Sequence, residues 1–163
     1  MDLFSVPLID SQLYNIHNKT TFIMIVVWVL ICIIGIYAKN KKFITILLIA
    51  ISLLQEILDY INRLYLNNLY LVDFQKDLPL QLCHFAYWFS VVCLISQLYK
   101  NKYNQFYFNC AFFLGFSGAL QGIITVDLTS IYTMYDMLAL HLQHSLIILN
   151  LLWLIFAYKI KFN

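Results

Sequence analysis

Charged residues are scarce in this sequence. Aspartate, glutamate, lysine and arginine make up 11% of its 163 residues, whereas 63% are hydrophobic. A soluble domain has about a quarter charged residues. The formal net charge of +2 is also too small to indicate a nucleic-acid partner. The composition therefore predicts an integral membrane protein.

Proline and glycine are scarce as well, and the cysteines are not spaced as pairs. The sequence contains two prolines and four glycines, with no linker or repeat, so we expect residues 1–163 to form one domain. The four cysteines are scattered in or beside apolar runs, which fits neither a disulfide framework nor a Cys-x-x-Cys metal site. The first twenty residues lack a basic segment followed by an apolar core, so no cleavable signal peptide is expected.

Long apolar runs are what the sequence has instead. Each approaches the ~20 residues that cross a bilayer as a helix. They predict an all-α, polytopic bundle of about five transmembrane helices in a multi-pass protein of the cell membrane. Residues 1–19 are polar and mixed, and we expect them at the interface. The five runs are residues 20–38, 43–64, 79–99, 104–126 and 137–159.

Basic residues are distributed unevenly between the loops. With five spans, the segments 39–42, 100–102 and 159–161 share one side of the membrane, and they hold seven of the ten basic residues. The other side receives the remaining three. The positive-inside rule therefore predicts that the N-terminus lies outside and the C-terminus in the cytoplasm.

This orientation places polar side chains of four helices at one depth, within roughly 10 Å of the outer boundary at 1.5 Å per residue. The inner halves of the helices nearly lack such groups. We expect Glu56, Cys83, Gln121 and His144 to face the interior and to surround one cavity that opens toward the outer leaflet. The polar residues at this depth are Glu56, Asp59, Asn62, Gln81, Cys83, His84, Gln121, Thr125, Asp127, Asp136, His141, Gln143 and His144.

The stretch Leu78–His84 combines a proline, an amide, a thiol and an imidazole at the start of a run. Pro79 is tolerated in a first helical turn, which puts Cys83 and His84 about one turn inside the helix. A helix N-terminus and a nearby imidazole both favour a thiolate. A thiolate with a histidine and an orienting carboxylate is the minimum for nucleophilic acyl transfer.

The carboxylates and histidines at this depth can have roles other than acyl transfer. Asp59 and Arg63 are four residues apart and are expected to pair, whereas the deeper Glu56 needs a partner such as an imidazole. His141 and His144 are three apart on one helix face. Beside a thiol, these histidines could bind zinc or copper. We rank that metal site second, and the leading hypothesis needs no metal or cofactor.

Three stretches together resemble a known family. Leu78–Cys83 (LPLQLC) resembles the LPLHLC motif of the bacterial YwaF-like integral membrane proteins. Phe113–Leu128 resembles their glycine-rich helix, which ends in a TPD-type turn, and His144–Ile148 (HSLII) resembles their HGLII segment. Order and spacing agree over about residues 45–155.

The YwaF-like proteins are similar to the eukaryotic transmembrane protein 164 family, whose members are acyltransferases that remodel ether phospholipids with a cysteine and a histidine. The resemblance implies that Cys83 accepts the acyl group and that His144 is its base, with His141 as the alternative. This sequence differs in having Gln81 for a histidine and Val126 for a proline. It is also expected to be shortened by about two helices, which a second copy or a partner chain could replace.

These observations lead to a functional hypothesis: a lipid acyltransferase or lipid hydrolase acting on membrane phospholipid. Cys83 attacks an acyl ester, His144 moves the proton, and Glu56 or Asp59 orients an imidazole. Gln81 or Gln121 donates to the oxyanion, and His84 and Asp127 complete the substrate pocket. The alternatives are a small-solute binder or transporter component, and a catalytically degenerate structural or assembly protein.

The topology is testable by labelling. A reporter fused after Asn163 is expected to read as cytoplasmic, because the lysine bias holds that end inside. A cysteine introduced at Asn67 should react with an impermeant reagent from outside. Labelling at Asn67 only after the membrane is permeabilised would invert the orientation.

Overall fold

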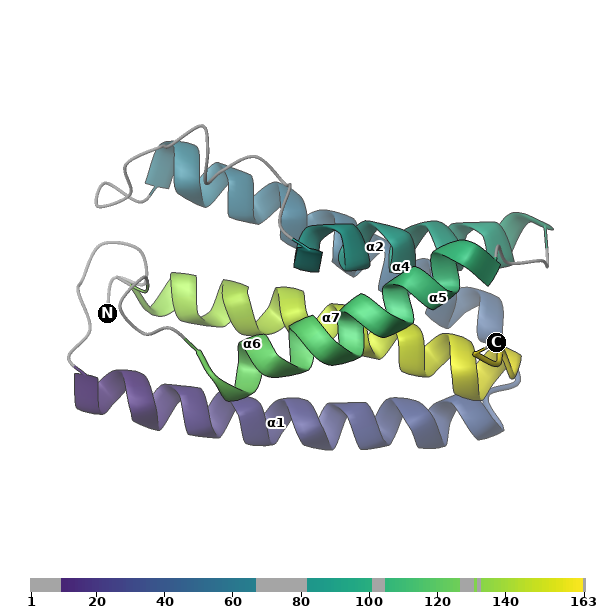
Figure 1. The fold of residues 1–163 in the computed structure, drawn as a ribbon, viewed down its shortest axis with the longest axis horizontal. Helices are drawn as coiled ribbons and strands as arrows, with labels where there is room; N and C mark the ends of the chain where they lie inside the picture. Colours follow the sequence, from purple (N-terminus) through teal and green to yellow (C-terminus); the bar gives the residue numbers. More distant parts are fainter. Residues whose placement is uncertain (1–9, 67–81, 101–104, 127–130, 132, 163) are drawn as a thin grey trace.

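The structure, a computed structural model, describes residues 10–66, 82–100, 105–126, 131 and 133–162. Within these ranges the chain forms helices and no strand, and five rods are long and apolar enough to cross a membrane (Figure 1). The predicted all-α bundle with five spans is confirmed. The rods are α1 (Asp10–Tyr37), α2 (Lys41–Ile61) continued by η1 (Asn62–Leu66), α4 (Leu82–Lys100), α5 (Gln105–Leu114) with η2 (Gly115–Ala119) and α6 (Leu120–Ile124), and α7 (Met134–Tyr158).

Helix α1 begins earlier than the apolar run predicted. The expected span was 20–38, with residues 1–19 at the interface, but α1 is already helical at Asp10. Leu13 is buried in a small cluster with Ile131 and Met137, which lies at the start of α7. Apolar contact with α7 therefore favours about three additional turns of helix before the hydrophobic run begins.

Helix α7 is the centre of the bundle. It contacts α1, α2, α4 and the α5–η2–α6 rod, and it is the most buried of the five spans. Its apolar side chains Ile147, Leu151, Trp153 and Leu154 are fully buried in the main core. The other helices pack around α7 and leave their outward faces apolar and exposed, as expected for surfaces that contact lipid tails.

Two glycines allow neighbouring helices to approach α7 closely. A Cβ added at Gly35 of α1 would lie 3.0 Å from Phe156 Cβ and 3.1 Å from Ala157 N. One added at Gly115 would lie 2.8 Å from a methyl group of Ile147. Small residues at such positions bring helix backbones together in membranes. The two glycines thus fix how deeply α1 and the α5–η2–α6 rod seat against α7.

Near the middle of the bundle, polar side chains link three helices. The Asn150 amide of α7 donates to Ser52 Oγ of α2 at 3.2 Å and to Ser90 Oγ of α4 at 3.1 Å. Ser90 in turn donates to the Tyr87 carbonyl at 2.7 Å, and the Tyr87 hydroxyl donates to the Ser52 carbonyl. Sequence reasoning expected few polar groups at this depth and missed this network.

The basic segments meet at one end of the bundle. α1 ends at Tyr37, α2 begins at Lys41, α4 ends at Lys100 and α7 ends at Tyr158, all at the right-hand end of Figure 1. The Lys41 ammonium donates to the Ala157 carbonyl at 2.6 Å and ties the start of α2 to the end of α7. The compartment that this end faces stays a prediction.

The network around Asn150 makes a stability prediction. Asn150→Leu keeps a similar volume but removes both interhelical hydrogen bonds, so it should lower the free energy of unfolding by about 1 kcal/mol. Ser117→Ala is the matched control, because Ser117 is exposed and its hydroxyl bonds only within its own rod. Unfolding in mixed micelles measures both. Equal stability of Asn150→Leu and the wild type would contradict an energetic role for the network.

Candidate functional site

The thiol and an imidazole lie against the same glycine-bearing rod, with His144 about halfway along α7 and Cys83 at the end of α4 away from the lysines (Figure 1). A Cβ placed at Gly118 would lie 3.6 Å from Cys83 Sγ, and one placed at Gly122 would lie 2.8 Å from His144 Nε2. Residues four apart on a helix share a face, with Cβ positions about 5–6 Å apart. Cys83, in the first turn of α4, and His144 of α7 therefore occupy neighbouring turns of one surface.

The ring of His144 is fixed by its own helix. Its Nδ1 lies 2.8 Å from the Leu140 carbonyl oxygen. Because a carbonyl only accepts hydrogen bonds, Nδ1 carries the proton and donates it. In the neutral ring Nε2 is then the basic nitrogen, and it is the atom turned toward Gly122. This tautomer suits a group that accepts a proton beside Cys83.

A second imidazole is connected to a carboxylate through an amide. The Gln143 amide nitrogen lies 3.0 Å from His84 Nε2, which accepts the bond. Gln143 also hydrogen-bonds Glu56. The sequence suggested a direct partnership between Glu56 and an imidazole, but Gln143 intervenes. Gln143 was noted only for its depth, and it is the residue that joins α2, α4 and α7 here.

Several buried polar atoms near this connection have no hydrogen-bond partner within the described part of the chain. They include Nδ1 of His84 and one carboxylate oxygen of Glu56. Both amide atoms of Gln55, one turn from Asp59 on α2, are in the same state. A buried polar group without a partner is costly. These buried atoms are therefore available to form hydrogen bonds with a ligand.

His141 points elsewhere. Its Nδ1 donates to the Met137 carbonyl at 2.8 Å, so its Nε2 accepts from His17 Nδ1, also at 2.8 Å. The two rings meet edge to face with centroids 5.0 Å apart. His141 therefore faces α1, whereas His144 faces Gly122 of α6. No group of three or more histidine, cysteine or acidic side chains suited to a metal occurs among the described residues.

Asp59 has the partner that the sequence indicated. Its carboxylate lies 2.9 Å from the Arg63 guanidinium, which confirms the predicted ion pair at the end of α2. One turn away, Asn62 donates to Asp136 at 3.2 Å. Asp136 also closes a capping box with Thr133 at the start of α7. These contacts hold the end of the α2–η1 rod and the start of α7 together.

Of the remaining predicted residues, one lies on the surface and two lie outside the described part of the chain. Gln121 is exposed on α6, which differs from the expectation that it faces the interior. Its neighbour Gly122 takes the inward position, because adjacent helical residues differ by about 100° in direction. Gln81 and Asp127 lie outside the described residues. Cys93 is buried in the core, and Cys32 and Cys110 are half-buried.

The two glycines give a matched pair of variants. Gly122→Ala places a methyl group 2.8 Å from the His144 ring, so the ring or the rod must move. Gly118→Ala places one 3.6 Å from Cys83, an ordinary contact. We expect only Gly122→Ala to shift the His144 side-chain ¹⁵N resonances and to lower stability, by about 1–3 kcal/mol. Equal effects of the two variants would contradict the seating of His144.

Of the comparisons with known proteins, one gives a match, and that match covers the whole bundle. Neither a curated protein nor a solved structure matches the sequence. The model of the TMEM164 family matches residues 10–163, which include all five spans and every described residue of the site. The match agrees with the resemblance carried by the LPLQLC and HSLII segments, and it fits a multi-pass membrane protein. The chain therefore belongs to the TMEM164 family.

Proposed function

We propose that this protein is a lipid acyltransferase or lipid hydrolase of the cell membrane, with Cys83 as nucleophile and His144 as its base. One observation carries the proposal. Gly118 and Gly122, four residues apart on one rod, adjoin the Cys83 thiol and the His144 ring respectively. A side chain larger than hydrogen at Gly122 would push the His144 ring away from the rod, whereas the rod meets the Cys83 thiol at Gly118 with ordinary contact distance to spare.

The chemistry follows from the two groups. Nε2 of His144 removes the thiol proton as Cys83 attacks the carbonyl carbon of a phospholipid acyl ester. The ester C–O bond breaks, the acyl group stays on sulfur as a thioester, and the lysolipid alkoxide leaves with the proton from His144. A second lysolipid hydroxyl, or water, then gives its proton to Nε2 and attacks the thioester. The C–S bond breaks, and the released Cys83 thiolate takes the proton back from Nε2. The acceptor decides between acyl transfer and hydrolysis.

His84 is the side chain that we propose as donor to the oxyanion. With Nε2 accepting from Gln143, the neutral ring carries its proton on Nδ1, and that buried atom has no partner among the described residues. A donor held in place before reaction stabilises the charge that develops on the carbonyl oxygen. Glu56 acts at a distance by holding Gln143, so it is a positioning residue.

Trapping the acyl-enzyme tests the proposal. The purified chain in vesicles that contain a phospholipid, without lysolipid acceptor, should gain the mass of one acyl chain on Cys83, and neutral hydroxylamine should remove it. Cys83→Ser should lose the hydroxylamine-sensitive adduct, and Cys32→Ser should keep it. His144→Ala should slow acylation about 10²–10⁴-fold, the usual contribution of a general base.

His141→Ala separates the two histidines. Because His141 bonds to His17 and not to the glycine rod, its loss should slow acylation far less than the loss of His144. Intact-mass kinetics of both variants give the comparison. A larger effect of His141→Ala would reassign the base, and a wild-type protein without a thioester on Cys83 would overturn the proposed activity.

A further inference from the structure

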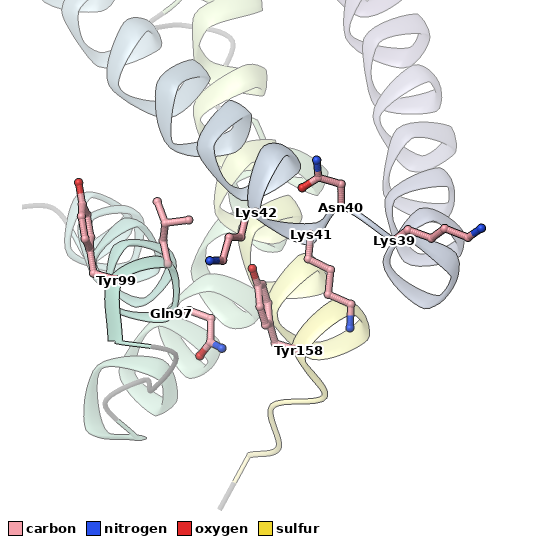
Figure 2. Close-up of a pocket in the computed structure, with 8 residues that line it drawn as sticks. Lys39, Asn40, Lys41, Lys42, Gln97, Tyr99 and Tyr158 are labelled. Carbon is pink, nitrogen blue, oxygen red and sulfur yellow. The ribbon is translucent and has the colours of Figure 1, made fainter.

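The opposite end of the bundle holds a pocket that the proposed chemistry does not use. It has a volume of about 510 Å³ and is lined by Lys39–Lys42 at and just before the start of α2, by Gln97–Tyr99 at the end of α4, and by Tyr158 at the end of α7 (Figure 2). Three elements that are distant in sequence thus form its wall. Ligand pockets of small molecules have volumes of about 300–1,000 Å³.

The wall of this pocket is positively charged. Among the residues that the structure describes, Lys39, Lys41 and Lys42 contribute to it and no acidic residue does. The eight acidic residues of the sequence all lie outside residues 11–55, 78–126 and 137–163, the stretches that supply the wall. The positive end of the α2 dipole adds charge of the same sign. The described wall therefore carries positive charge without a carboxylate and favours an anion.

Part of this wall is held in place by hydrogen bonds. Thr45 gives its hydroxyl proton to the Lys41 carbonyl at 2.8 Å, so the Tyr158 hydroxyl is the donor in its 2.9 Å bond to Thr45. The Lys41 ammonium is anchored on the Ala157 carbonyl and lies 5.9 Å from the centre of the Tyr158 ring. Tyr158 and Lys41 are thus positioned before any ligand arrives.

Lys42 is the cation best placed to meet a ligand. Its side chain is exposed, and Figure 2 shows its ammonium between Tyr99 and Tyr158, with the Gln97 amide close by. Lys39 also adjoins the pocket, but its side chain extends away from the other labelled groups in the same view. A compact ammonium with tyrosine and amide groups around it is suited to a phosphate.

The surroundings favour a lipid as the source of that phosphate. The pocket lies at the ends of spanning helices, where tyrosines mark the level of the headgroups. Tyr99 is 82% exposed, and Phe43, next to Lys42, is 63% exposed. Along α2 the exposed Ile46 and Leu47 continue this apolar surface toward the bilayer centre. A headgroup in the pocket would leave its acyl chains beside these side chains.

We propose that this pocket binds the phosphate-bearing headgroup of an anionic phospholipid. The positive-inside rule predicts that this end faces the cytoplasmic leaflet, where anionic lipids raise the negative surface potential. The site is independent of Cys83 and His144, because it lies at the lysine-rich end of the bundle and shares no residue with them. It is a resident lipid site and not the reaction centre.

Native mass spectrometry of the full chain in detergent tests this site. Phosphatidylglycerol should remain bound in preference to phosphatidylcholine of equal chain length. Lys42→Gln should weaken phosphatidylglycerol binding roughly fivefold, the effect of one lysine near an anionic lipid surface. Lys161→Gln is the matched control, because Lys161 is exposed at the same end but does not line the pocket. Lys42→Arg, which keeps the charge, should bind like the wild type.

Three outcomes would overturn the proposal. Equal retention of the two lipids would exclude headgroup selection, and equal losses for Lys42→Gln and Lys161→Gln would show diffuse attraction to the whole lysine-rich end. Displacement of phosphatidylglycerol by millimolar inorganic phosphate, with no preference for the lipid, would identify a free-phosphate site. The acyl-enzyme on Cys83 is measured separately, so failure of either proposal leaves the other intact.

Discussion

The close contact between α7 and the glycines of its neighbours is the interaction on which this structure depends. Gly35 seats α1 against Phe156 and Ala157, and Gly115 and Gly122 seat the α5–η2–α6 rod against Ile147, Leu151 and His144. In a bilayer the hydrophobic effect does not drive helices together, so packing at short distance and interhelical hydrogen bonds must do so. The same contacts that hold the bundle together also place the imidazole of His144.

Polar groups occur at three successive positions along the axis of α7. His141, Gln143 and His144 serve the end that holds Cys83, Asn150 ties α2 and α4 near the middle, and Tyr158 belongs to the lysine-lined pocket. Together these groups bond to α1, α2 and α4. A bilayer interior offers no water to replace a lost partner, which explains why a single helix with so few polar residues can organise the whole bundle.

The sequence predicted the five spans well because hydrophobic length is a local property. Interior details depended on rotation about the helix axes, which a run of apolar residues does not specify. Gln121 was expected to face inward, yet Gly122 takes that direction. His141 and His144 share a face broadly, but only the packed structure shows that one meets α1 and the other α6. Asn150 was missed because one amide in an apolar run gives no periodic signal.

The π-helical turn η2 has a consequence for how this rod can vary. Such a turn contains one residue more than an α-helical path of similar shape, and it lies between Gly115 and Ala119, just before Gly122. Winding the same residues as a regular α-helix would rotate everything beyond them by about 100°. Gly122 would then no longer face His144. The turn therefore sets the direction in which the residues after it point. Relatives without it would need their small residues shifted by one position along the sequence.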